Sequence, residues 1–205
     1  IWIDQKDMVY EVPVEKRPKM VIFNSGMRVP CKVEFNKPIS EWIMQLEEGP
    51  HILDRIAAVN VLKKKKGRRN IENALLKAIE TDSFWGVRKE AVRGLASLKP
   101  KQYSEDLMRI SEGQDNRVRR AIWSALKNYK NDTDVSLFLQ NIIFSDPKYY
   151  SVSDAFKALV VVDTAAARKN VDNLLSINSH SDVIRKAAIS YFGIVKNNQN
   201  YDRLK

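Results

Sequence analysis

The side chains that could carry out chemistry are few in this chain, and they are scattered. The 205 residues include two histidines, His51 and His180, and one cysteine, Cys31. The histidines stand in an expected turn and an expected loop, whereas a zinc site needs about three protein ligands within reach of one another. Cys31 falls in an expected strand with no His or Asn partner nearby in sequence. We therefore expect no zinc ligand and no cysteine nucleophile.

The remaining residue types do not build a catalytic site either. Neighbouring carboxylates such as Glu47 and Glu48 show no sign of a paired general acid and base. The seven glycines are scattered and form no phosphate-binding loop. The sequence thus predicts no catalytic residue, no metal ligand and no cofactor within these 205 residues.

The most concentrated charge is a basic run. Lysine and arginine outnumber aspartate and glutamate by 35 to 25, so the net charge is +10. The run comprises Lys63, Lys64, Lys65, Lys66, Arg68 and Arg69. It could contact nucleic acid, or it could be a solvated helix end, since cations complement the dipole there and Gly67 is a natural C-cap. No aromatic side chains interleave to stack on bases, so we favour the helix end and do not expect nucleic acid as a partner.

The elements that carry these residues are revealed by a repeat. Val87, Ala91 and Leu95 lie at i, i+4 and i+8, which is one stripe of a helix. The apolar triplet recurs every 31–34 residues, at Leu53/Ala57/Val61, Val118/Ile122/Leu126, Val152/Phe156/Val160 and Ile184/Ala188/Phe192. A second amphipathic helix precedes each triplet, and one such pair cannot bury its stripe alone. We predict a mainly α fold in which residues 38–205 form an α–α superhelix of about five helical pairs.

Charged residues mark the start of the second helix in several units. An apolar residue directly precedes each of Arg88, Arg119 and Arg185. A capping aspartate lies a few residues earlier in each case, at Asp82, Asp115 and Asp182. This pattern resembles the HEAT repeat, and the resemblance implies that the aspartates and arginines pair between neighbouring repeats. Asp54 and Ser153 occupy the arginine position in the first and fourth units, so we expect the ladder to be interrupted there. Ligand binding is the alternative role for these arginines.

Residues 1–37 differ from the rest. Short β-prone runs at 1–3, 8–12, 19–23 and 29–35 are separated by polar turns. Three or four strands cannot bury both faces of a sheet, so we predict the end of a β-sandwich, with a self-contained meander as the alternative. The chain begins without Met, and we expect it to be a piece of a larger protein. No apolar run approaches the ~18 residues of a membrane span.

Longer stretches carry a second resemblance. Residues 84–91, Phe-Trp-Gly-Val-Arg-Lys-Glu-Ala, resemble the C-terminal helical region of zinc aminopeptidases of the aminopeptidase N family, the gluzincins. Residues 19–24 followed by Ser40-Glu41-Trp42 resemble the end of that family's β-sandwich and the entry to its helical domain. Asn24 stands where that family usually has Asp, and neither its His-Glu-x-x-His motif nor its Gly-x-Met-Glu-Asn segment occurs.

The resemblance implies the non-catalytic C-terminal part of a zinc aminopeptidase. Zinc would lie in a catalytic domain outside this sequence, where zinc-bound water hydrolyses the first peptide bond of a substrate. The partners would be the rest of the chain and peptide substrates, and the stack would cap the active-site opening, with its second helices on the inner face. The competing hypotheses are a HEAT-repeat scaffold for protein partners, including a catalytically dead aminopeptidase-like transcription subunit, and a nucleic-acid-binding basic solenoid. Compartment and substrate preference are not set by the sequence.

Overall fold

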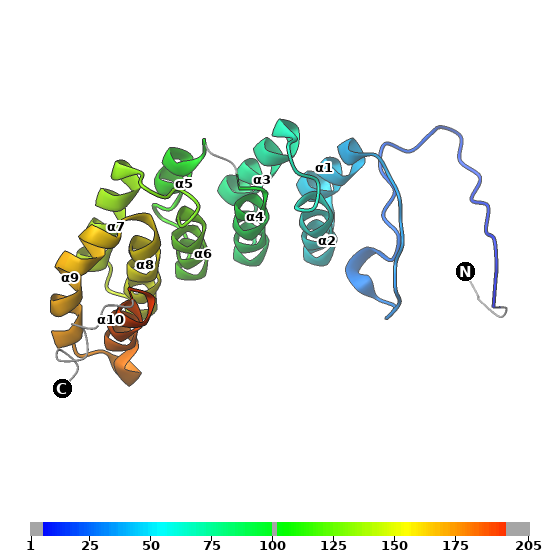
Figure 1. Cartoon of the computed structure of the whole chain (residues 1–205). Helices are drawn as coiled ribbons and strands as arrows, with labels where there is room; N and C mark the ends of the chain where they lie inside the picture. The colour runs from blue at the N-terminus through cyan, green and yellow to red at the C-terminus, as the bar shows by residue number, and fades with distance from the viewer. Residues whose placement is uncertain (1–5, 100–101, 196–205) are drawn as a thin grey trace.

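Helical pairs set side by side form most of the molecule (Figure 1). The computed structural model describes residues 6–99 and 102–195, and in that part the helices are α1 (Ile39–Glu48), α2 (Ile52–Leu62), α3 (Arg69–Thr81), α4 (Trp85–Leu98), α5 (Ser104–Ile110), α6 (Asn116–Leu126), α7 (Thr133–Ser145), α8 (Tyr149–Val162), α9 (Thr164–Ser176) and α10 (Val183–Ile194). Consecutive helices pack as pairs, α1 with α2 through to α9 with α10. The predicted α–α superhelix is confirmed.

The second helices of the pairs form one continuous layer. Helices α2, α4, α6, α8 and α10 each pack on the next, while α1 packs on α3 and α5 on α7. The row is arched, and the second helices lie on its concave side (Figure 1). Because neighbours supply the contacts, the apolar seam runs through the stack from pair to pair.

The apolar stripe predicted from the repeat is buried in four of the five units. Val87, Ala91 and Leu95 are at most 1% exposed, and the triplets beginning at Val118, Val152 and Ile184 are also buried. For the first unit, the predicted stripe is displaced by one residue, because Leu53 is 42% exposed whereas Asp54, Ala58 and Leu62 are buried. A carboxylate thus occupies the position that an apolar side chain fills elsewhere.

The β segment predicted for residues 1–37 is wrong for the part that the structure describes. Residues 6–37 contain no strand, only the 3-10 turn η1 (Ser25–Met27), while residues 1–5 lie outside the described ranges. A β-prone run needs a partner strand to satisfy its backbone groups, and none faces it here. Val9, Val12, Val14 and Phe23 are more than half exposed. Residues 6–37, called the arm below, form an irregular segment whose first part extends away from the stack (Figure 1), while its turn η1 packs on α2.

One helix end holds a non-glycine residue in the left-handed region. Lys99 follows α4 with φ 55° and ψ 50°, where a Cβ costs about 1 kcal/mol. We expect Lys99→Gly to raise the free energy of unfolding by roughly 0.5 kcal/mol, since glycine also gains freedom in the unfolded chain. Urea unfolding followed by circular dichroism measures this. Lys99→Ala keeps the Cβ and serves as the control, and an equal gain in that variant would rule out relief of strain.

Candidate protein-binding surface

Buried ion pairs join neighbouring helical pairs. The guanidinium of Arg55 donates from Nε to Oδ2 of Asp82 at 2.7 Å and from a terminal nitrogen to Oδ1 at 3.2 Å. The two side chains are 13% and 6% exposed. Arg119 contacts Asp146 of the next unit through a single terminal nitrogen, at 2.9 Å, and its Nε is buried without a hydrogen-bond partner. The interruption expected at Asp54 is wrong, because the adjacent Arg55 makes the contact to the next unit.

Arg88 and Asp115 are placed differently. Arg88 donates to the backbone carbonyl of Asp82 at 2.7 Å, and its Nε is buried without a hydrogen-bond partner. Asp115 caps α6 by accepting from the backbone N–H of Arg117, and it also binds that guanidinium at 2.8 and 2.9 Å. The hydrogen bonds from Arg117 hold the pKa of Asp115 far below its usual range, and the charge of Arg88 acts in the same direction.

Arg185 acts within the last pair. It lies 3.4 Å from Asp182 and donates from Nε to the carbonyl of Leu175 at 3.1 Å. Asp182 precedes α10 with φ 54° and makes no side-chain cap hydrogen bond. The charged residues at the starts of the second helices therefore make contacts within the stack.

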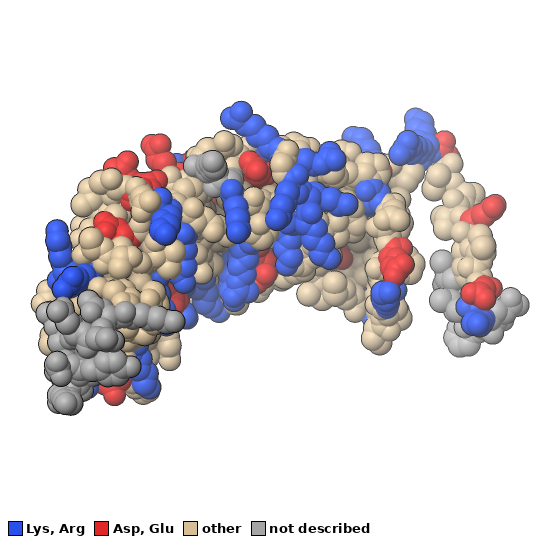
Figure 2. Space-filling view, in the orientation of Figure 1, with Lys and Arg blue, Asp and Glu red and all other residues tan. Residues whose placement is uncertain are grey.

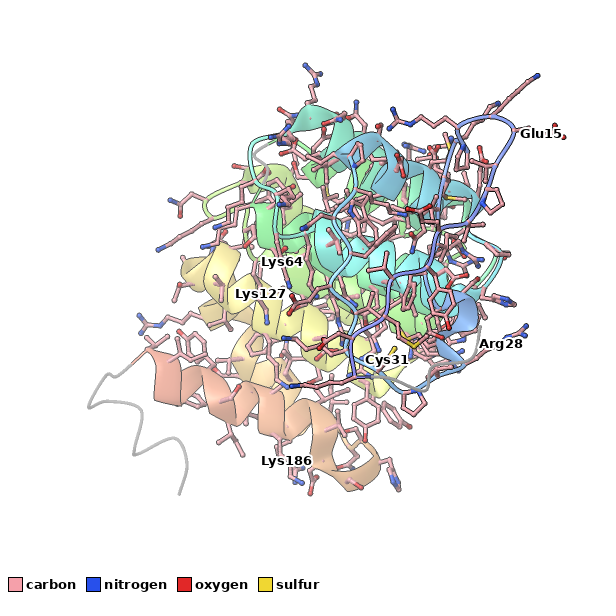
Figure 3. The ribbon with its side chains drawn as sticks, turned by 90° about the vertical axis from the view of Figure 1, so that its right-hand side faces the viewer. Glu15, Arg28, Cys31, Lys64, Lys127 and Lys186 are labelled. Atoms are coloured by element: carbon pink, nitrogen blue, oxygen red, sulfur yellow. The ribbon has the colours of Figure 1, made fainter. Side chains whose placement is uncertain are left out.

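The basic run 63–69 connects the end of α2 to the first residue of α3, Arg69. Lys63 follows the last residue of α2, and its carbonyl accepts a hydrogen bond from Ser97 of α4 at 3.4 Å. Gly67 has φ 72°, a backbone conformation that favours glycine. Viewed along the stack, Lys64 lies on the same side as Lys127, which follows α6 (Figure 3). The run and Lys127 therefore lie toward the same side of the stack, and Lys127 is part of a second basic region.

That second region is a groove of about 570 Å³ between α4 and α6, called the inner groove below. Its floor consists of small side chains, which are Ala96, Ser97, Ala121, Ser124 and Ala125. Its rim is basic, with Lys89, Arg93, Arg117, Arg120 and Lys127, and it is completed by Asn128 and Asp154. The space-filling view shows lysine and arginine side chains gathered over the middle of the row (Figure 2).

Neighbouring side chains orient the cations of the inner groove. Arg120 donates from Nε to Asp154 at 2.6 Å. The guanidinium of Arg117 stacks on the ring of Trp85, 3.5 Å from the ring centroid. Burial lowers the pKa of Lys127, and the charge of Asp154 opposes that effect. Held in this way, the cations lose less freedom when an anionic ligand binds.

The arm is attached to the first pair through Asp54. This carboxylate is 3% exposed and accepts hydrogen bonds from Ser25 Oγ at 2.6 Å and from the Gly26 N–H at 2.8 Å. Gln45 donates to the backbone carbonyl of Asp54 at 2.7 Å, and Lys37 donates to Gln45. Burial raises the pKa of Asp54, but the hydrogen bonds from Ser25, Gly26 and His51 lower it by more, so the net shift is downward.

Removing this carboxylate is expected to release the arm. Asp54→Ala leaves the Ser25 and Gly26 donors unpaired, so trypsin should cut after Arg28 about tenfold faster while the helical circular dichroism is retained. Because the folded pKa of Asp54 is depressed, its stabilising effect exists above the unfolded value of about 3.9 and is lost as the pH falls through the folded pKa. Relative to the variant, the wild type should be cleaved by pepsin at Phe23 increasingly fast as the pH falls below about 4. Equal profiles would contradict this role.

The remaining candidate residues are dispersed. The ring of His51 lies against Gly26, where an added Cβ would come within 3.2 Å of it, and His180 opens the 3-10 turn η2 (His180–Asp182). Cys31 is exposed. Within residues 6–99 and 102–195, no cluster of three His, Cys, Asp or Glu side chains could hold a metal ion. No helix in those ranges is long and apolar enough to cross a bilayer.

Stacked helical pairs with a continuous apolar seam define an α-solenoid repeat protein. The sequence matches HEAT repeats over residues 39–127 and 71–160, so the chain belongs to the HEAT-repeat family. Comparison with solved structures matches a chain in the complex of CpcE and CpcF of phycocyanin lyase from Nostoc sp. PCC7120. That chain is 15% identical, with 81% of this chain and 80% of that chain covered and a TM-score of 0.46. Comparison with curated proteins finds no match.

These findings overturn the resemblance to aminopeptidase N. The matched family is that of HEAT repeats, and the described part of the segment expected to end a β-sandwich contains no strand. The quoted motif at residues 84–91 includes Val87 and Arg88, which belong to the repeat pattern itself. The expectation of zinc in an adjoining catalytic domain, and of peptide substrates, depended on that resemblance and has lost its basis.

Proposed function

We propose that this protein is a HEAT-repeat scaffold that binds another protein on its concave face. The observation that carries the proposal is the inner groove, which opens between two second helices and is lined by charged and small side chains. The apolar seam behind it is buried, so core packing sets the positions of the two helices that form the groove.

Membership of the HEAT-repeat family also supports partner binding on the concave face. HEAT arrays present extended concave surfaces, and a stack that touches only its neighbours leaves the whole inner layer available to a ligand. The lining residues of the inner groove are lysine, arginine, serine, alanine, asparagine and one aspartate. Such side chains recognise a partner through charge and hydrogen bonds.

Site-specific photo-crosslinking tests the scaffold function. A photoreactive amino acid replaces Ser124 on the floor of the inner groove or, as the control, exposed Asn141 of α7 in the outer layer. We expect illumination in the source cells to give a discrete protein adduct from position 124 that is absent from position 141. Mass spectrometry identifies the partner, and titration of the two purified proteins then measures the affinity. Indistinguishable adducts at the two positions would refute concave-face binding.

A further inference from the structure

We propose that the inner groove binds an extended acidic segment of the partner, with carboxylates of that segment paired to the cations of the rim. This inference rests on the proposed scaffold function and specifies the chemistry of the partner. It is carried by the charge and the shape of the groove.

The rim has an excess of positive charge with donors to spare. Five cations line the inner groove, against one lining carboxylate, Asp154. Arg120 uses only its Nε on Asp154, so both terminal nitrogens face no hydrogen-bond acceptor among the described residues. Arg93 likewise commits one nitrogen, to Glu90 at 2.6 Å. A guanidinium with free N–H groups matches a carboxylate in a two-pronged geometry.

The shape of the inner groove favours a short extended chain. Its volume of about 570 Å³ lies within the range of ligand sites that enclose small groups. Alanine and serine on the floor allow a peptide backbone to approach α4 and α6 closely, while the longer cations reach over it from the rim.

The same lining disfavours nucleic acid. No aromatic residue lines the inner groove. Of the rings beside it, Trp85 has one face covered by the guanidinium of Arg117, and Tyr150 has the guanidinium of Arg120 over its ring at 5.0 Å from the centroid. Stacking of bases on aromatic rings, which supports binding of single strands, is therefore not provided. A continuous polyphosphate would also meet the carboxylate of Asp154, whereas a peptide can place its acidic residues away from it.

The test uses a fluorescein-labelled peptide of about twelve residues with alternating Glu and Gly, measured by fluorescence anisotropy. The groove variant carries Lys89→Gln and Arg93→Gln, and its matched control carries Arg168→Gln and Lys169→Gln on exposed positions of α9. Both variants lose one lysine and one arginine. We expect the groove variant to bind about tenfold more weakly and the control to change by less than about threefold.

Three results would overturn the proposal: equal weakening in both variants, equal binding of a Gln-Gly peptide, or tighter binding of an oligothymidylate of matched charge with the same dependence on the groove.

If the double variant does not fold, Ser124→Glu and Ser124→Gln replace it. Glu should then abolish peptide binding and Gln should not, and equal effects would refute the proposal. If crosslinking at position 124 succeeds but the peptide does not bind, only the proposal of an acidic segment is refuted. If crosslinking fails, the proposed scaffold function is refuted.

Discussion

Trp123→Ala is expected to lower the free energy of unfolding by about 4 kcal/mol, because truncation of a buried aromatic side chain leaves a cavity. Trp123 lies on α6 and is 0% exposed. Its ring packs against Phe138 of α7 with centroids 5.5 Å apart. Its indole N–H donates to Ser151 Oγ of α8 at 2.8 Å. One side chain therefore joins the third and fourth helical pairs through both packing and a hydrogen bond.

Two controls separate these contributions to Trp123. Trp123→Phe keeps most of the ring but loses the indole donor, and it should cost less, about 2 kcal/mol. Leu137→Ala on α7 removes a side chain that is 56% exposed, and it should cost less than about 0.5 kcal/mol. Urea unfolding followed by circular dichroism measures all three variants. A loss for Trp123→Ala as small as that for Leu137→Ala would contradict the joining role.

The second large effect is expected at Arg55. Arg55→Met should lower the free energy of unfolding by about 3 kcal/mol, because it leaves the Asp82 carboxylate, 6% exposed, without its cation. The backbone N–H of Phe84 still donates to Asp82 at 2.9 Å, so part of the hydrogen bonding survives. The contact links the first and second pairs, and its loss should open that interface first.

An exposed bridge between neighbouring pairs is the matched control for Arg55. Arg109 of α5 pairs with Glu80 of α3 at 2.9 Å, with side chains 58% and 46% exposed. Arg109→Met should lower the free energy of unfolding far less than Arg55→Met does, and that loss should shrink in salt. A double-mutant cycle with Asp82→Asn measures the coupling of Arg55 to Asp82 directly. If both variants lose the same free energy of unfolding, burial does not strengthen the contribution of the Arg55–Asp82 pair.

The helical stack was predictable because its signal is local and repeated. Val87, Ala91 and Leu95 define a stripe that recurs along the chain, and each recurrence supports the others. The buried stripe of the first unit was mispredicted because Asp54 is buried there, and its carboxylate accepts a hydrogen bond from the Gly26 N–H, 28 residues away. A contact between residues so far apart leaves no trace in a periodic pattern of apolar residues.

The arm and the inner groove required the three-dimensional structure. The β-prone residue types at 8–12 favour a strand, but a strand is stable only beside a neighbouring strand. For the inner groove a signal existed, since Lys89 and Arg93 follow the stripe positions Val87 and Ala91 by two residues, and Arg120 follows Val118 in the same way. Whether such side chains converge depends on the curvature of the stack, which the sequence does not encode locally.

The reliance of each helical pair on its neighbours alone has a mechanical consequence. Under tension applied to its two ends, such an array is expected to stretch like a soft spring, because small tilts at every interface add up to a large extension. Pairs would then come away one after another, each at a modest force, and a stretched molecule could recoil from whichever pairs remained intact.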